Sequence, residues 1–216
     1  MSPMNISRRG ALLAGAIGAV SVPLMAGQAF ADVGNKNAMV YIDPGHGGSD
    51  TGATGHGLVE KDLCLDIALQ TRDMLVAKGG VDVRMSRTDD ATLSLDARTN
   101  DANSWGAALF VSIHINAGGG TGFESYRYPS AGEPTVGYHN TLHPAILGAM
   151  NSHAGVVDRG PKTANFHVLR ESAMPAILTE NLFIDQADDA GKLADPGFIT
   201  ATARGHADGI AQIFGL

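Results

Sequence analysis

The stretch "VYIDPGHGGSDTGATGHGLVEKD", residues 40–62, joins a strand-like apolar run to a glycine-rich loop and an acidic cluster. Its six glycines accompany His46. Glycine at this density marks either loops with unusual backbone dihedrals or a backbone that another group approaches closely. A bound phosphate, a metal ion and a simple turn are the three alternative explanations of this loop. The rest of the sequence distinguishes among them.

The composition bounds the class of protein and the kind of site. With 216 residues, 44% hydrophobic and 17% charged, the chain is typical of a soluble globular domain. Its 22 acidic against 15 basic residues argue against nucleic-acid binding through a basic surface. Cys64 is the single cysteine, which excludes an intramolecular disulfide and a multi-cysteine zinc site. Any metal must therefore be held by His, Asp or Glu.

Residues 1–31 have the pattern of an export signal. A short basic start is followed by the apolar run "ALLAGAIGAVSVPLMAG" and by a small-x-small ending before Asp32. The pair Arg8-Arg9 resembles a twin-arginine signal. The alternative is a retained membrane anchor, which Pro23 and the weakly apolar Ala and Gly content disfavour. We expect export to the periplasm or beyond, with no stable membrane anchor.

Residues 32–216 show no internal repeat, linker or break in composition, and we expect one folded domain. Apolar runs alternate with helical patterns, which predicts an α/β architecture. Helices are expected over 60–78, 93–106, about 138–155 with Pro144 as a kink or as the true start, and 196–216. Strands or extended segments are expected over 37–43, 81–87, 108–117, 122–129, 166–172 and 174–183.

Three polar residues arrive where an α/β sheet usually binds its ligand, beyond the carboxyl ends of the strands. His46 follows the first predicted strand, Glu60 begins the first helix, and His114 lies at the end of the most apolar strand. Two imidazoles and one carboxylate suit a catalytic zinc ion with one open position. A phosphate loop is disfavoured because neither GxGxxG nor Gly-Lys-Ser/Thr opens a helix here.

A metal site of this kind also needs a base that is not a ligand, and Glu180 fits by its place after the apolar run "AIL". It would take a proton from the attacking water and pass it to the leaving nitrogen. Each of these residues also has a purely structural interpretation. His114 would be a hydrogen-bonded core histidine, Glu60 an acidic residue that complements a helix dipole, and Glu180 half of a structural ion pair.

The motifs "DPGHGGSDTGATG", "VEKD", "LFVSIHINA", "GFESY" and "DRGPKTANFHVLRESAMPAILTENLFI" occur in the order and spacing of one family. Over residues 39–214 the chain resembles the zinc-dependent N-acetylmuramoyl-L-alanine amidases of bacterial division, sporulation and phage lysis. The resemblance implies one Zn²⁺ per chain on His46, Glu60 and His114, with Glu180 as catalytic acid/base. It also implies a single domain, residues 32–216, with a twisted, mostly parallel sheet flanked by helices on both faces.

The family's reaction cleaves the amide between N-acetylmuramic acid and L-alanine in peptidoglycan or muropeptides, and we expect a monomer. One enzymatic rival is a zinc peptidase that cuts inside the stem peptide. The other is a non-catalytic muropeptide-binding protein, although such proteins typically lack a ligand or the base. The segment after "GFESYRY" is too short for a regulatory insert that plugs the site, so an open cleft is expected.

Four further residues are candidates with two interpretations each. Asn116 would bind substrate or hold a turn, and Arg170 would bind a stem-peptide carboxylate or form a surface ion pair. Glu124 would approach the zinc site or merely follow strand alternation. Asp43 would orient a ligand histidine or cap a turn. A departure from many relatives is Asn181-Leu182, where they carry a glycine before the phenylalanine.

Overall fold

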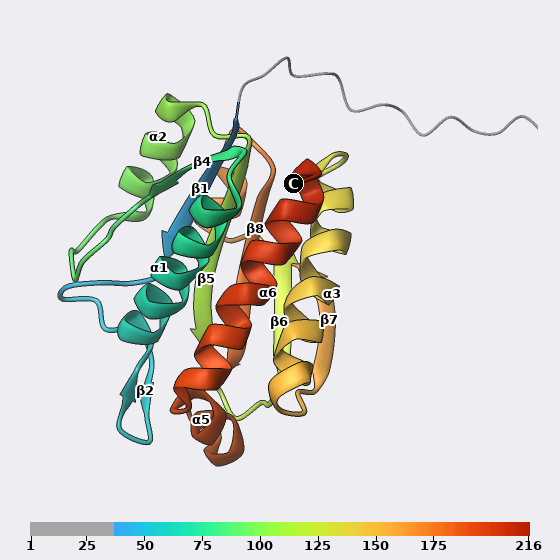
Figure 1. Ribbon diagram of the computed structural model, residues 1–216. Coiled ribbons are helices and arrows are strands. Elements are labelled where there is room, and N and C mark those ends of the chain that lie inside the picture. The colour runs from blue at the N-terminus through green and yellow to red at the C-terminus, as the bar shows by residue number, and fades with distance from the viewer. Residues whose placement is uncertain (1–36) are drawn as a thin grey trace, which may run out of the picture. The chain divides into compact units, whose positions relative to one another are not determined.

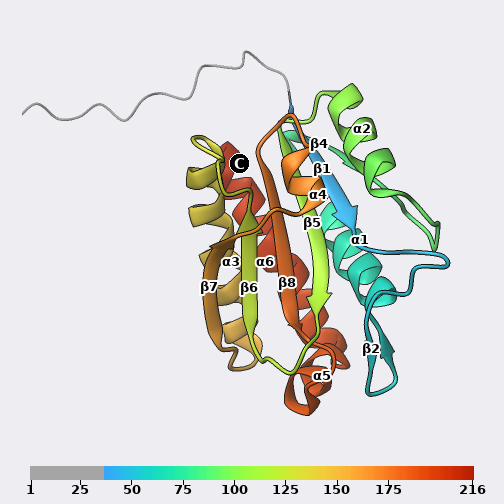
Figure 2. The same cartoon turned by 180° about the vertical axis from the view of Figure 1, so that it is seen from behind.

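A computed structural model describes residues 37–216, which form one six-stranded sheet with helices on both faces (Figures 1 and 2). The export signal proposed for residues 1–31 lies outside the described residues. The sheet order is β4-β1-β5-β8-β6-β7. Its strands are β1 (Ala38–Pro44), β4 (Val81–Met85), β5 (Leu109–Asn116), β6 (Phe123–Arg127), β7 (Asp158–Thr163) and β8 (Ala176–Phe183).

Four neighbouring strands, β4, β1, β5 and β8, run parallel. β6 is antiparallel to β8, and β7 is parallel to β6. The predicted mostly parallel sheet is therefore confirmed. A separate two-stranded hairpin of β2 (Thr54–Gly55) and β3 (Leu58–Val59) extends from the loop that leads to the first helix.

One face of the sheet is covered by three long helices, α1 (Glu60–Lys78), α3 (Thr135–His153) and α6 (Pro196–Phe214) (Figure 1). We call it the core face. The Asp195 carboxylate caps α6 by accepting from the Gly197 N–H, and the left-handed Gly215 ends the helix. The side chains that α6 turns toward the sheet include Phe198, 1% exposed, and Ile210, fully buried. This side holds the larger apolar core of the domain.

The other face carries only two shorter helices, α2 (Leu95–Trp105) and α4 (His167–Arg170), and we call it the site face (Figure 2). Ser94 caps α2 by accepting from the Ala97 N–H. A smaller apolar cluster, which includes Tyr41, Phe110 and Leu178, packs beneath these helices. Such short helices leave room for a cleft over the strand ends.

The expectations for individual elements are largely confirmed, and α1 has the predicted bounds. Residues 166–172 were expected to be extended, which is wrong. They contain the single helical turn α4, whose Val168 and Leu169 are buried in the smaller apolar cluster of the site face. Pro144 does not mark the start of its helix, because α3 begins at Thr135. The sequence patterns also missed β7 and the helix α5 (Ala187–Leu193). No helix within residues 37–216 is long and apolar enough to cross a membrane.

Candidate metal centre and active site

The loop after β1 is held by two buried guanidinium groups. Arg87 donates from Nη2 to the Gly45 carbonyl at 2.6 Å. Arg98 donates to the carbonyls of Pro44 at 2.7 Å and His46 at 2.6 Å. Since each buried carbonyl receives a charged donor, the loop has a defined path although it contains many glycines. The loop thereby places His46 over the end of the sheet.

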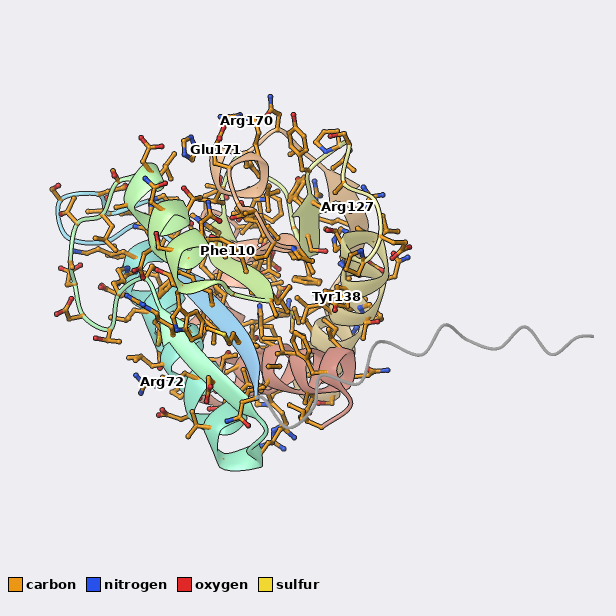
Figure 3. The ribbon with its side chains drawn as sticks, turned by 90° about the horizontal axis from the view of Figure 1, so that it is seen from above. Arg72, Phe110, Arg127, Tyr138, Arg170 and Glu171 are labelled. Atoms are coloured by element: carbon orange, nitrogen blue, oxygen red, sulfur yellow. The ribbon has the colours of Figure 1, made fainter. Side chains whose placement is uncertain are left out.

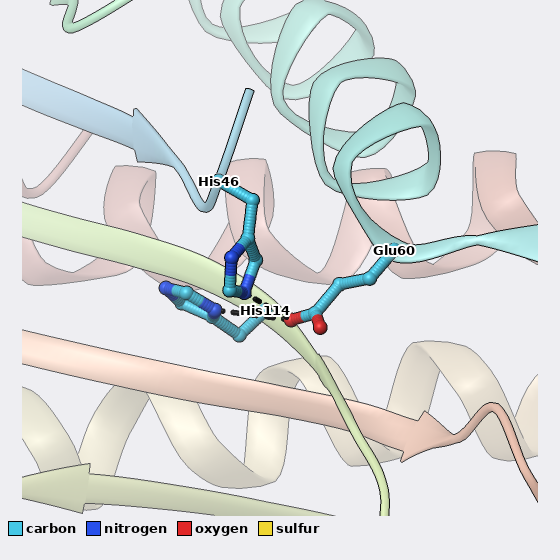
Figure 4. A group of neighbouring side chains, drawn as sticks. All are labelled: His46, Glu60 and His114. Atoms are coloured by element: carbon cyan, nitrogen blue, oxygen red, sulfur yellow. Dashed lines mark hydrogen bonds and ion pairs between the residues drawn. The ribbon is translucent and has the colours of Figure 1, made fainter. Parts of the chain in front are cut away.

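Three side chains converge on one point at the carboxyl ends of β1 and β5 (Figure 4). His46 Nε2 lies 3.0 Å from Glu60 Oε1, and His114 Nδ1 lies 3.1 Å from the same oxygen. One donor atom from each residue lies within 4.8 Å of the other two. The two imidazole rings are nearly perpendicular, at 82°. Two imidazole nitrogens and a carboxylate oxygen at this spacing are compatible with a metal ion.

Glu60 and His46 are each oriented by further hydrogen bonds. The Glu60 carboxylate accepts from the backbone N–H groups of Ala53 at 2.8 Å and Ile115 at 3.1 Å. His46 Nδ1 lies 2.9 Å from Asp50 Oδ2, which leaves its Nε2 directed at Glu60. Partners of this kind fix the tautomer and the ring plane of a metal-binding histidine. Asp50 was not predicted, although its position four residues after His46 was visible in "HGGSD".

Asp43, a candidate for that orienting role, makes other contacts. Its carboxylate accepts from Arg98 at 2.7 Å, Ser86 at 2.6 Å and Ser112 at 2.7 Å. Asp43 is 1% exposed, and Arg98 is the residue that also holds the His46 carbonyl. Asp43 therefore acts on the loop through Arg98, and in the described part of the chain no hydrogen bond joins it to a histidine ring.

Two glycines of the quoted stretch show why the loop needs them. A Cβ on Gly45 would lie 2.4 Å from Cε1 of His114. Gly52 has a φ of +63°, and a Cβ there would lie 2.5 Å from Glu60 Oε2. Any larger residue would push into the His-Glu-His group at either position. Of the three alternatives for the loop, close approach to the His-Glu-His group, whose donor atoms are compatible with a metal ion, accounts for these positions.

The charges of the group favour an ionised carboxylate between the rings. Burial by itself would raise the pKa of Glu60, but hydrogen bonds from His114 and His46 hold that pKa well below its usual range. Burial likewise opposes the charged form of His46, yet Glu60 and Asp50 together raise the pKa of His46. Glu60 is therefore an anion at neutral pH and is ready to bind a cation.

Glu180 lies beside this group on β8, paired in register with His114 on β5. β8 continues beyond Glu180 to Phe183, in agreement with the extended segment predicted over 174–183. Its Oε2 is buried and has no hydrogen-bond partner within residues 37–216. Burial raises the pKa of Glu180 to about 7, and the nearby charges of Glu60 and Glu124 act in the same direction. Such a carboxyl group can both accept and donate a proton near neutral pH.

The strand bends directly after Glu180. Leu182 has a left-handed φ of 70°, and the β5–β8 register shifts between His114 and Asn116. This position is the one where many relatives were expected to carry glycine, which adopts such a φ without strain. The departure seen in the sequence is therefore a leucine in a glycine conformation.

A cleft of about 540 Å³ opens over these residues on the site face. The His-Glu-His group, Glu180 and Asn116 line it. Other lining residues are apolar, such as Leu95 on α2 and Phe166 before α4, or polar, such as Ser94 and Asp50. The expected open cleft is consistent with the short segment between β6 and α3.

Arg170 and Glu124 lie away from the metal-binding group. Arg170 is on α4 and lies beside Glu171 (Figure 3). Its side chain is 37% exposed, donates to Glu171 at 2.6 Å and to Asn165 at 2.7 Å, and does not line the cleft. Glu124 accepts a hydrogen bond from Asn116 at 2.8 Å and does not join the histidines. The substrate-binding role of Arg170 stays a prediction.

Comparison with known proteins identifies the family. The family model described as N-acetylmuramoyl-L-alanine amidase matches residues 40–212. The chain belongs to the N-acetylmuramoyl-L-alanine amidase family. The sporulation-specific N-acetylmuramoyl-L-alanine amidase of Bacillus subtilis (strain 168) is 58% identical over 178 residues, which cover 82% of this chain and 68% of that protein. An endolysin of Bacillus phage SPP1 is 45% identical over 181 residues, which cover 82% of this chain and 66% of that protein.

Solved structures of amidase domains share the fold. The catalytic domain of CwlV, an N-acetylmuramoyl-L-alanine amidase from Bacillus (Paenibacillus) polymyxa var. colistinus, superposes with a TM-score of 0.77 at 35% identity and covers 82% of this chain and 98% of that one. An N-acetylmuramoyl-L-alanine amidase from Clostridium difficile 630 gives a TM-score of 0.79 at 34% identity, covering 83% and 98%. The resemblance noted in the sequence is thus confirmed, and the amidase family places the protein among peptidoglycan hydrolases.

Proposed function

We propose that this amidase uses one Zn²⁺ ion, held by His46, Glu60 and His114, to hydrolyse the amide between N-acetylmuramic acid and L-alanine. The observation that carries the proposal is the convergence of three ligand atoms within 4.8 Å at the floor of an open cleft. The names of the relatives support the choice of bond. Glu180, beside the ligands but not one of them, is the proposed acid/base.

The donor set fits zinc better than the other common divalent ions. Zinc accepts two imidazoles and one carboxylate in catalytic sites, whereas magnesium and calcium prefer oxygen ligands throughout. When bound, the ion would supply Lewis-acid polarisation of the amide carbonyl and lower the pKa of a water molecule. No sulfur ligand takes part, because Cys64 is fully buried on α1.

Glu180 would carry the proton through the reaction. Its unpartnered Oε2 accepts a proton from the attacking water, and the same oxygen then donates it to the nitrogen of L-alanine as the amide bond breaks. Asn116 holds the cleft wall beside it. One N–H of the Asn116 Nδ2 group donates a hydrogen bond to Glu124, and the second N–H is available to a substrate carbonyl.

The test is hydrolysis of MurNAc-L-Ala-D-isoglutamate by the purified chain, before and after a chelator and after zinc is added back. Release of the free dipeptide should stop with the chelator and return with zinc. Mass spectrometry of the products separates the rivals, since a peptidase would leave L-alanine on the muramic acid. Stoichiometric zinc binding with no cleavage of fragment or polymer would instead indicate a binding protein.

The export route is a separate proposal that rests on the sequence. We propose that residues 1–31 direct the protein to the periplasm or the exterior, where peptidoglycan lies, and that the mature enzyme is a monomer. Replacing Arg8 and Arg9 by lysine should keep the protein in the cytoplasm if the twin-arginine route is used. Normal export of that variant would contradict this route, and light scattering of the mature chain would check the monomer.

A further inference from the structure

Two cations on the edge strand β7 meet one buried carboxylate beside the cleft. Arg159 Nε donates to Glu124 Oε2 at 2.6 Å, and Lys162 Nζ donates to the same oxygen. The other oxygen accepts from Asn116 at 2.8 Å and from Tyr126 at 2.7 Å. Glu124 is 3% exposed, whereas the side chains of Arg159 and Lys162 stay 33% and 36% exposed. We call Arg159 and Lys162 the cationic shelf.

The shelf carries more positive charge than Glu124 requires. One carboxylate neutralises one cation, so the group keeps a net positive charge in a chain whose formal net charge is −7. Its donors are also in excess. Within residues 37–216, Arg159 uses Nε on Glu124, makes a long 3.5 Å contact from Nη1 to the Thr121 carbonyl, and makes no bond from Nη2. Lys162 uses one of its three N–H groups.

The shelf is also ordered before any ligand arrives. Burial opposes the charge of Glu124, but hydrogen bonds from Lys162, Arg159 and Tyr126 keep the pKa of Glu124 at about 2. The carboxylate therefore stays ionised and holds both cations at neutral pH. The Arg159 guanidinium also lies 4.9 Å above the ring centroid of Phe183, which fixes it from a second side. Two pre-ordered cations lose little side-chain entropy when they bind an anion.

The register of the sheet places the shelf on one particular side of the proposed catalytic residue. Glu124 on β6 lies directly opposite Glu180 on β8, and directly opposed side chains share a face of the sheet with their Cβ atoms about 5 Å apart. Asn116, which lines the cleft, contacts Glu124. Arg159 and Lys162 do not line the cleft themselves and are connected to it through Glu124 and Asn116. On the α2 side the cleft is lined by Leu95, 52% exposed, together with polar residues such as Ser94 and Arg98. The two partly exposed cations of the shelf therefore lie on the β6–β7 side of Glu180.

We propose that Arg159 and Lys162 form a carboxylate-binding subsite for the stem peptide, so that the peptide lies on the β6–β7 side of the scissile amide and the sugar on the α2 side. This inference rests on the proposed function. The muramic acid has no free carboxylate once its lactyl group is in the amide, whereas D-isoglutamate after L-alanine carries one. Guanidinium and ammonium groups together suit that carboxylate through charge-assisted hydrogen bonds.

The test compares two dipeptides whose γ-carboxyl group is blocked as a methylamide, as it is blocked by the next residue in a stem peptide. They are L-Ala-D-isoglutamate, which carries the α-carboxylate, and its α-carboxamide L-Ala-D-isoglutamine, so that they differ by that one charge. Calorimetry with the full chain should show that the carboxylate form binds about tenfold or more tightly, as expected for one charged hydrogen-bond pair. R159Q and K162Q should each lose about tenfold in affinity for the carboxylate form and almost nothing for the carboxamide form. K78Q, which removes a cation paired with Asp208 on the core face, is the matched control and should behave as wild type.

Hydrolysis of the two corresponding MurNAc fragments gives a second readout. The variants should raise KM for the carboxylate fragment alone and leave kcat on both fragments close to wild type. Each single variant leaves Glu124 one cation, and circular dichroism checks that it folds. If a variant does not fold, the wild-type preference between the dipeptides still decides, because equal binding of both would overturn the subsite.

Two further outcomes separate this inference from the proposed function. If R159Q and K162Q keep the preference for the carboxylate dipeptide and R170Q loses it, the proposed subsite is overturned. Arg170 on α4 would then bind the stem-peptide carboxylate. Cleavage of neither fragment by zinc-loaded wild type, with the dipeptide preference intact and lost in R159Q, would overturn the amidase mechanism but support the subsite.

Discussion

The two faces of the sheet differ in what they do with polar groups. The core face buries large apolar side chains under three long helices, and its buried polar groups, such as His206 and Thr179, are hydrogen-bonded to each other at 3.0 Å. The site face has two short helices, a cleft, and the buried Glu180 oxygen without a partner. A sheet that is stabilised mainly from one side can leave the other side for a strained and charged site.

On the site face, the directly opposed carboxylates of Glu124 and Glu180 show the same contrast between a hydrogen-bonded and an unpartnered polar group. Glu124 accepts hydrogen bonds from four side chains, and its pKa is held at about 2. Glu180 lies directly opposite, is unpartnered at Oε2, and has a pKa raised by burial to about 7. The same residue type is a fixed anion in one position and a proton carrier in the other, because only the surroundings differ.

Glu180→Gln should have the largest effect, because it should lower activity while it raises stability. We expect kcat to fall by about 10²–10⁴-fold because the proton carrier is lost. The pKa of Glu180 is raised by folding, so its carboxylate costs stability as the pH rises above the unfolded value and toward 7. Without metal at pH 8, the free energy of unfolding of the variant should therefore exceed wild type, by about 2–3 kcal/mol. Hydrolysis assays and urea unfolding measure the two quantities, with Glu171→Gln, at an exposed residue directly after α4, as the control.

Phe198→Ala on the core face should do the opposite. Phe198 is 1% exposed in the larger core, and removing its ring should cost about 3–5 kcal/mol in the free energy of unfolding. The kcat per folded molecule should stay near wild type, because the residue packs on the face away from the cleft. Urea unfolding and activity at low temperature test this. A kcat that fell in proportion to stability would show that the two faces are not independent.

The pH dependence of stability should come in part from the core face. Burial lowers the pKa of His206 to about 4, below its ordinary value of 6.5. The unfolded chain therefore binds the proton first as pH falls from 6.5 to 4, and the folded state should lose up to about 3 kcal/mol from this residue. Below pH 4 both states are protonated and the loss stops growing. His206→Asn should flatten this part of the unfolding profile, while an unchanged slope would contradict it.

The smallest expected effect is at Leu182, which is buried in the larger core at the bend of β8. A protein with glycine inside a strand is normally less stable than the same protein with alanine there. At position 182 the left-handed φ of 70° reverses this order, and we expect Leu182→Gly to be more stable than Leu182→Ala by about 1 kcal/mol. Both variants lose the same buried side chain, so their difference isolates the backbone. Equal unfolding midpoints would show that the bend relaxes.

Sequence patterns located most of the elements and the four central site residues. α1 was found with its bounds, because its apolar spacing and the glycines after it are local signals. The sequence singled out His46, Glu60, His114 and Glu180 because each lies in or beside a recognisable element, and the structure brings the first three together with Glu180 next to them. α4 was missed because a single helical turn is too short to show a helical period.

The sequence by itself therefore determined the residue types of the site, the order of the elements and the family. Only the tertiary structure decided the partners: Asp50 on His46, Arg98 on the glycine loop, and the cationic shelf on Glu124. The physical reason differs between them: the Asp50 contact depends on how the glycine loop folds, whereas the other two depend on strand register and crossover. Register sets Glu124 opposite Glu180 although 55 residues separate them, and no local pattern of either segment carries that pairing.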